Sequence, residues 1–209
     1  MSPALAFADE TLRCRIRIDL EPVYGQEIDV PYPLDTKTAH LRALEEAALT
    51  FAGMMYGWDF DYEIGERARK IEEKLEMVER GSIRFGDPRL SVTDAELEKA
   101  SLFVWAEYRT DETQQRRLDY WKTGLARNVQ AMGKAALAGW ADSKKAALED
   151  AARAALRALL RSNERNRPKR AIGAIALAEA PRYWIAGGHW LVSARFRALI
   201  TEIIPFSAY

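Results

Sequence analysis

The chain has 209 residues, with 31 basic and 31 acidic side chains and a formal net charge of zero at pH 7. This balance argues against a protein that binds nucleic acid through bulk electrostatic attraction, and no run of residues approaches the ~18 apolar positions that a transmembrane helix requires. The chain is short enough to build one hydrophobic core. We therefore expect a single α+β domain over residues 1–209, with residues 92–166 as a candidate helical subdomain.

Residues 1–10 show no periodic pattern, so we expect them to be flexible. Ala6 and Ala8 resemble the small residues before a secretory cleavage site, but the basic start and the long apolar stretch of a signal peptide are missing. We expect a cytoplasmic protein; the alternative is a periplasmic or secreted protein whose signal peptide lies upstream of Met1. Cys14 is the single cysteine, and its place among alternating apolar residues predicts a buried, unreactive thiol.

Apolar and charged residues alternate from Thr11 to Leu20, which predicts a strand with one buried face. Its exposed face holds Arg13, Arg15 and Arg17. A proline-rich loop follows, with room for a short strand at 28–30. Asp35 then fits an N-cap of a helix over 36–56. Apolar residues recur at helical spacing in this segment, namely Leu41, Leu44, Ala48, Phe51 and Met55.

The stretch from 58 to 64 alternates as strictly as the first strand. Aromatic residues and Ile64 share one face, and the opposite face is acidic, with Asp59, Asp61 and Glu63. A charged helix is expected over 66–79, and a short strand at 82–85.

Three helices are expected in the middle of the chain, over 93–108, 110–136 and 142–159. Pro168 ends the helical pattern, and residues 172–177 fit either a strand or a short helix. The pair Gly187-Gly188 predicts a hairpin turn between residues 182–185 and a return strand over 189–203. Along that strand the face opposite the apolar residues carries Arg195 and Arg197.

Together these elements predict an α+β fold with one antiparallel sheet. The sheet is built from the N-terminal strand, the 58–64 strand and the C-terminal strands. The helix 36–56 packs on this sheet, and residues 92–166 form an inserted helical layer.

Eight charged residues form the candidate ligand-binding set: Arg13, Arg15, Arg17, Asp59, Asp61, Glu63, Arg195 and Arg197. A structural interpretation is favoured, in which acidic and basic strands lie side by side and opposite charges pair across them. The alternative is a ligand surface, because arginine binds carboxylates and phosphates and clustered acids bind hard cations. The aromatic residues Trp58, Tyr62, Trp121, Trp184 and Trp190 fit a hydrophobic core better than a pocket.

No nucleophile elbow, phosphate loop, dinucleotide fingerprint or zinc-ligand spacing is present. We therefore expect no cofactor and no metal, and no catalytic residue can be named. The leading hypothesis is a non-enzymatic binding or interaction module for a protein or small molecule, with export in bacteria as an option. The alternative is a hydrolase-like or metal-dependent enzyme that uses Asp59, Asp61 and Glu63, with His40 or His189 as the available imidazoles.

Overall fold

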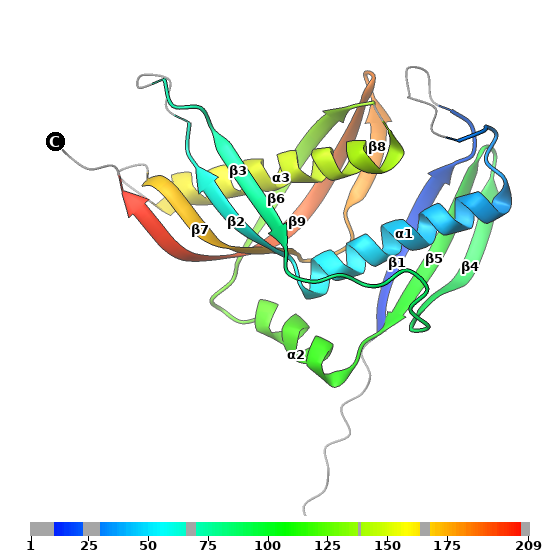
Figure 1. Ribbon diagram of the computed structural model, residues 1–209, viewed down its shortest axis with the longest axis horizontal. Helices are drawn as coiled ribbons and strands as arrows, with labels where there is room; N and C mark the ends of the chain where they lie inside the picture. Colours follow the sequence, from blue (N-terminus) through cyan, green and yellow to red (C-terminus); the bar gives the residue numbers. More distant parts are fainter. Residues whose placement is uncertain (1–10, 23–29, 66–69, 138, 164–167, 206–209) are drawn as a thin grey trace, which may run out of the picture.

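The computed structural model describes residues 11–22, 30–65, 70–137, 139–163 and 168–205. The described residues form two antiparallel sheets and three helices (Figure 1). The smaller sheet has the order β1 (Thr11–Asp19), β5 (Ser101–Arg109), β4 (Leu90–Glu98). The larger sheet has the order β3 (Lys74–Glu79), β2 (Trp58–Glu63), β7 (Pro168–Leu177), β9 (His189–Pro205), β6 (Arg127–Ala136), and β8 (Arg182–Ala186) also pairs with β9. The helices are α1 (Thr36–Met55), α2 (Glu112–Trp121) and α3 (Trp140–Asn163).

Helix α1 connects the two sheets (Figure 1). It crosses the face of the smaller sheet and ends where β2 begins, while α3 lies on the larger sheet and packs against β6 and β9. Helix α2 lies beside the C-terminal end of α1, where the indole Nε1 of Trp121 donates to the carbonyl oxygen of Met55 at 3.0 Å. One cluster of buried apolar residues includes side chains from both sheets and all three helices. None of the described helices is long and apolar enough to span a membrane.

Small residues bring α1 close to the sheet. Asp35 caps the helix by accepting from the backbone N–H of Thr38 at 2.8 Å, as its sequence predicts. The buried face is built largely from alanines, among them Ala39, Ala43 and Ala47, whereas Leu41 is exposed. The predicted apolar stripe is therefore only partly correct, because alanine permits a closer approach to the sheet than leucine does.

Helix α3 and strand β6 are in similarly close contact. A Cβ placed on Gly133 would lie 2.2 Å from the carbonyl oxygen of Ala147 and 2.3 Å from the backbone nitrogen of Ala151. In addition, the backbone N–H of Lys134 donates to the Asp150 carboxylate at 3.1 Å. Helix α3 thus covers this edge of the larger sheet.

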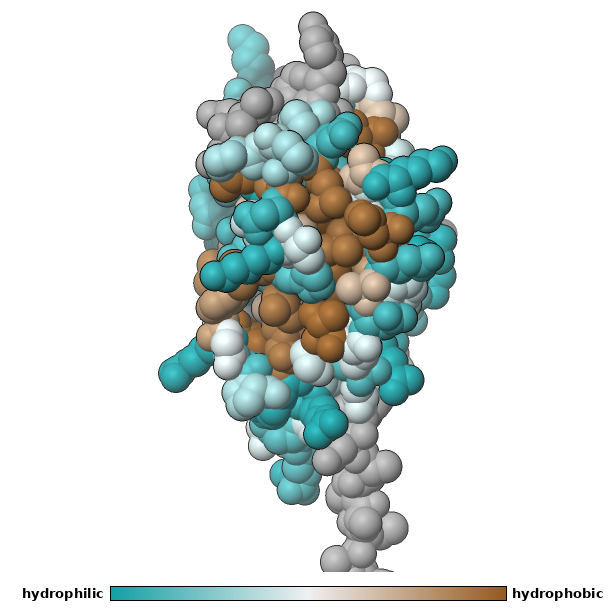
Figure 2. Space-filling view, turned by 90° about the vertical axis from the view of Figure 1, so that its right-hand side faces the viewer, coloured by the Kyte–Doolittle hydropathy of each residue, from teal (hydrophilic) through white to brown (hydrophobic). Residues whose placement is uncertain are grey.

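The side of the molecule that holds α1, β4 and β5 exposes apolar surface. Figure 2 views this side and shows a continuous hydrophobic strip framed by hydrophilic residues. Exposed large apolar residues of these elements include Leu41 of α1 and Leu97 of the edge strand β4. The smaller sheet is therefore covered only partly by its helix.

The α+β class is confirmed, and so are the first strand, the helix 36–56, the 58–64 strand and the C-terminal hairpin. The segment 172–177, which fitted a strand or a helix, belongs to strand β7. The predicted strand at 28–30 and the expected flexibility of residues 1–10 fall wholly or mostly outside the described residues.

Four predictions about the fold are wrong. The single sheet is in fact two, because β1 pairs with β5 and β2 pairs with β3 and β7. The helical layer over 92–166 holds the strands β4, β5 and β6 as well as α2 and α3. Residues 74–79, expected to be helical, form strand β3, and residues 82–85 form no strand. In β3, β4, β5 and β6 pairing with other strands overrides the local helix propensity.

Candidate functional site

The eight charged residues that the sequence singles out do not share one face. Arg13, Arg15 and Arg17 lie on the smaller sheet, and the other five lie on the larger one. Within the larger sheet β7 separates the acidic strand β2 from β9. The predicted juxtaposition of these three charged strands is therefore wrong.

Most of these charges pair locally with residues that the sequence did not single out. Asp61 forms a two-point ion pair with Arg170 of the neighbouring strand β7, with 2.6 Å between Arg170 Nε and Asp61 Oδ1. The hydrogen bond from Arg170 is the largest cause of a lowered pKa of Asp61. Single-contact ion pairs join Asp59 to Arg80 at 3.2 Å, Arg13 to Glu107 at 2.7 Å and Arg195 to Glu179 at 3.4 Å.

The fold does not bring together metal-ligating side chains around the acidic strand, as the metal-dependent alternative requires, among the described residues. Among the described residues, no group of three or more His, Cys, Asp or Glu side chains could hold a metal ion. His40 and His189 each contact a nearby backbone oxygen, with Nδ1 at 2.7 Å from Thr36 O and 2.8 Å from Gly187 O. Neither histidine lies near the acids of β2 in sequence or in sheet position.

A cleft of about 550 Å³ lies between the smaller sheet and strand β8. One wall is formed by β1 with adjoining residues of β5, and the other by β8 with Trp190 of β9. The floor is supplied by Glu46 of α1 and Lys144 of α3. This volume lies within the ~300–1,000 Å³ that small-molecule sites occupy.

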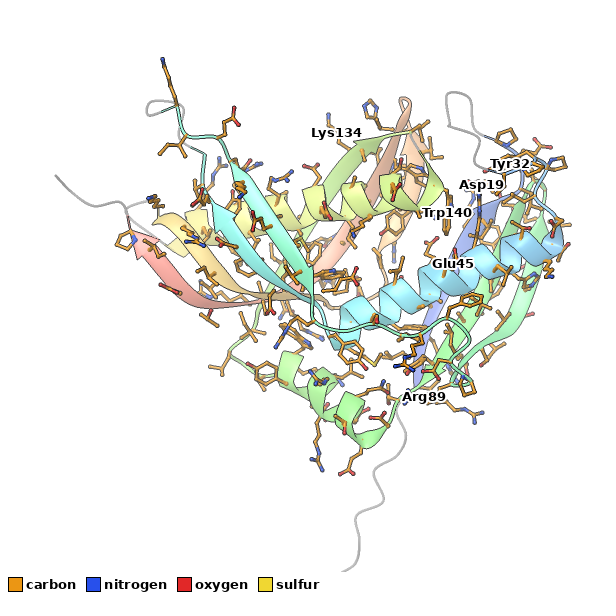
Figure 3. All side chains as sticks on the ribbon, viewed as in Figure 1. Asp19, Tyr32, Glu45, Arg89, Lys134 and Trp140 are labelled. Carbon is orange, nitrogen blue, oxygen red and sulfur yellow. The ribbon has the colours of Figure 1, made fainter. Side chains whose placement is uncertain are left out.

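The floor contains an ion pair surrounded by aromatic rings. Lys144 Nζ lies 2.6 Å from Glu46 Oε2, and the two side chains are only 7% and 12% exposed. The same ammonium lies 4.7 Å from the ring centroids of Trp140 and Trp190 and 5.2 Å from that of Tyr183. Figure 3 shows Trp140 at the start of α3, on the side of that helix turned toward α1 and β1. Cation–π attraction to three rings adds to the ion pair and fixes the ammonium in place.

Two arginines in the cleft walls pair with no carboxylate in the part of the chain that the structure describes. Arg15 stacks with its guanidinium carbon 4.1 Å from the Phe103 ring centroid and 4.9 Å from that of Trp105. Neither Arg15 nor Arg182 forms an ion pair with any residue that the structure describes. Arg17, by contrast, contacts Asp19 at 2.8 Å. Stacking holds the Arg15 guanidinium flat against the sheet and leaves its N–H donors available.

Two aromatic residues of the wall formed by β8 and β9 have buried polar groups in an unusual environment. The indole Nε1 of Trp190 is buried and has no hydrogen-bond partner among the described residues. Burial, with a smaller contribution from Glu46, raises the pKa of the Tyr183 hydroxyl well above its usual range. Both groups are therefore neutral donors at physiological pH.

Comparison with known proteins places the chain in a family but indicates no activity for it. A protein-family model that carries no functional description matches residues 2–206. The chain belongs to this uncharacterised family. It is also similar to an uncharacterized protein of Treponema pallidum (strain Nichols), with 26% identity over 172 residues that cover 79% of this chain and 69% of the relative. No solved structure matches.

The predictions from the sequence included some of the residues that line the cleft and did not include others. Of the eight predicted charged residues, Arg15 and Arg17 line it, and so do Trp184 and Trp190 of the aromatic set. The missed residues that matter most are Glu46, Lys144, Arg182 and Tyr183. A signal for Lys144 was present, because this lysine lies on the same helical stripe as buried Ala147 and Ala151.

Proposed function

We propose that this protein is a binding module that holds an anionic ligand in the cleft between β1 and β8. The observation that supports the proposal most directly is the pair of arginines in the cleft walls, Arg15 and Arg182, which have no ion-pair partner among the described residues. An arginine without a carboxylate partner is a ready donor to a carboxylate or phosphate, and its fork geometry favours two-point binding.

The remaining lining suits an organic anion better than a bare inorganic one. Trp184 is 36% exposed and lines the cleft together with partly buried Phe103. Flat apolar surfaces beside a few convergent polar groups are typical of sites that bind organic molecules. The ligand class that fits is therefore an anion with an apolar part.

The polar groups of the cleft favour holding a ligand over transforming one. The Ser101 hydroxyl donates to Asp19 Oδ1 at 2.9 Å, and Lys144 is engaged by Glu46 at 2.6 Å. The raised pKa of Tyr183 makes its phenolate form rare. A nucleophile or general base needs a neighbouring group that activates it, and these pairings are instead those of structural side chains. The acids of β2, which the enzyme alternative requires, lie outside the cleft.

Calorimetric titration with tripolyphosphate, a small polyanion, tests the anion-binding part of the proposal, which depends on Arg15 and Arg182 and not on the apolar lining. We expect saturable binding to the wild type and at least about a tenfold loss of affinity in Arg15→Gln and in Arg182→Gln, since each removes a charge-assisted contact. Arg127→Gln is the matched control, because Arg127 is an exposed arginine of β6 that does not line the cleft. Absence of binding, or equal affinity in all four proteins, would contradict the proposal.

A further inference from the structure

The cleft runs along the edges of two strands. On one side it is lined by the consecutive residues Arg15, Ile16 and Arg17, and on the other by the consecutive residues 182–185. Successive side chains of a strand point to opposite faces of its sheet. A cleft along one face of a sheet would contact only every second residue of a strand. Because this cleft contacts every residue of both segments, it follows the backbone edges of the two strands.

Neither edge is used by another described strand. Strand β1 is the terminal strand of the smaller sheet and pairs only with β5, and β8 pairs only with β9. An open strand edge presents unpaired backbone N–H and C=O groups that another extended segment can bind. The two open edges line one cleft.

The hairpin turn defines which backbone groups of β8 point into the cleft. Gly187 and Gly188 both have positive φ, 58° and 73°, as a type I′ two-residue turn requires. In such a hairpin the residues flanking the turn, Ala186 and His189, form a hydrogen-bonded pair, and hydrogen-bonded pairs then alternate with non-hydrogen-bonded ones. Tyr183 and Ile185 fall in the non-hydrogen-bonded positions, so their N–H and C=O groups point to the open edge.

The same reasoning applies to β1. The backbone N–H of Leu20 donates to the carbonyl oxygen of Ala100 at 2.8 Å, which makes this pair a hydrogen-bonded one. Alternation along the strand then directs the N–H and C=O groups of Arg15 and Arg17 away from β5 and toward the open edge. Each edge thus directs the backbone groups of two residues toward the cleft, and these groups lie on the side that no described strand pairs with.

The side chains above and below these edges differ in character. Arg15 and Arg17 lie on one face of β1 and are exposed, with Arg182 exposed on β8. On the other face are Ile16, Tyr183 and Ile185, which are buried or partly buried near the Lys144–Glu46 pair. A strand placed between the edges would point its side chains alternately toward the arginines and toward these apolar wall residues.

We infer that the ligand is an extended peptide segment with alternating acidic and apolar residues, which adds as a strand to the open edges of β1 and β8. This inference rests on the proposed anion-binding function and specifies its ligand class. Charge complementarity selects the occupant, because Arg15 and Arg182 line the cleft and neither pairs with a carboxylate of the described residues. The run from Arg15 to Asp19 spans roughly 13 Å at the rise of a strand, so the cleft holds about four to five peptide residues. Backbone hydrogen bonds supply affinity and the alternating side chains supply selectivity, as in other strand-addition complexes.

The test uses a fluorescent pentapeptide, acetyl-Glu-Val-Glu-Val-Glu-amide, and measures its anisotropy with the full-length protein. Its matched control has the same charge and side chains but N-methylated valines, which cannot donate backbone hydrogen bonds. We expect the N-methylated peptide to bind at least about tenfold more weakly, and Arg15→Gln and Arg182→Gln to weaken the unmodified peptide while Arg127→Gln does not. Binding should also slow amide hydrogen exchange at Tyr183, Ile185, Arg15 and Arg17.

The possible outcomes separate this inference from the function on which it rests. Equal affinity of the two peptides, or binding of tripolyphosphate without binding of the peptide, would overturn strand addition and leave anion binding standing. Failure of both probes would overturn both. If the same amides are protected without peptide, in a dimer that Arg15→Glu dissociates, then a second copy of the chain occupies the cleft and the peptide proposal is wrong.

Discussion

The Lys144 ammonium of α3 and the Glu46 carboxylate of α1 form an ion pair of 2.6 Å in the interior of the protein, where both side chains are almost fully enclosed. Removal of one partner leaves the other charge buried and unpaired, which is strongly destabilising. We expect Lys144→Met to lower the free energy of unfolding by about 3–5 kcal/mol. Denaturant unfolding measures this change, with Lys145→Met as the control, since Lys145 is exposed one residue further along the helix.

The double variant Lys144→Met/Glu46→Leu separates charge from packing. Replacing both partners of a buried pair by apolar residues of similar size is often neutral or stabilising. We therefore expect the double variant to recover most of the stability that Lys144→Met loses. A double variant as unstable as the single one would show that Lys144 stabilises the fold through its aromatic contacts rather than through Glu46.

At Gly133 the backbone of β6 lies very close to the backbone of α3. A methyl group there would collide with backbone atoms of Ala147 and Ala151, which cannot move without shifting the helix. We expect Gly133→Ala to cost about 1–3 kcal/mol, the range of overpacked cores. Gly124→Ala is the matched control, because a Cβ at Gly124 meets nothing within 4 Å. Equal thermal midpoints of the two variants would contradict the predicted close contact.

Asp61 pairs with Arg170 across β2 and β7, and not with an arginine of β1. Both side chains are about one-third exposed, at 31% and 37%, so we expect a coupling free energy of no more than about 1 kcal/mol. A double-mutant cycle on Asp61→Asn and Arg170→Gln measures this energy, and added salt should reduce it. The same cycle on Asp61 and Arg15 is the control. Its expected coupling is zero because the two residues lie in different sheets.

Acid should destabilise the protein partly through Asp87. Its carboxylate accepts hydrogen bonds from the Arg89 guanidinium, at 3.2 and 3.0 Å, and from the Tyr108 hydroxyl at 3.1 Å. The bonds from Arg89, labelled in Figure 3, are the largest cause of a lowered pKa of Asp87 in the folded protein. Since the unfolded chain titrates near pH ~3.9, the contribution of Asp87 is present above that pH and is lost as the pH falls through the lower folded-state value.

Urea unfolding of the wild type and of Asp87→Asn between pH 7 and pH 3 checks this sign. We expect the difference in stability between the two proteins to be constant above about pH 5 and to shrink as the pH falls below about 4. Glu98→Gln, an exposed change on β4, serves as the control. A difference that grows toward low pH would contradict the prediction.

The β4–β5 hairpin shows why part of the fold could not be predicted from the sequence. Residues 94–98 have high intrinsic helix propensity, and pairing with β5 overrides it. The turn at Lys99 and Ala100 contains none of the residues that mark turns, although Lys99 adopts a positive φ of 54°. Strand β5 is also apolar on both faces, because Phe103 and Trp105 lie under Arg15, so its period of two was obscured. Where one face was charged, as in β1 and β2, the strand was predicted correctly.

The cleft was harder to predict than the fold. Arg15 and Arg17 could be identified as exposed cations from the alternation of β1, but which strand lies across the cleft from them depends on how the two sheets pack. Strand order places β7 beside β2, and the packing of the two sheets places β8 across the cleft from β1, in both cases through contacts far apart in the sequence. No local pattern encodes the distance between two sheet edges.

The reactivity of Cys14 can report local opening of the smaller sheet. This thiol, the single one in the chain, faces the core from the middle of β1, and burial raises its pKa to about 12. An exposed thiolate attacks alkylating reagents and displaces their leaving group, so the folded protein resists alkylation until the smaller sheet separates from α1. The rate of alkylation in native buffer therefore reports the free energy of that local opening. Whatever occupies the neighbouring edge of β1 should slow the reaction without touching the sulfur.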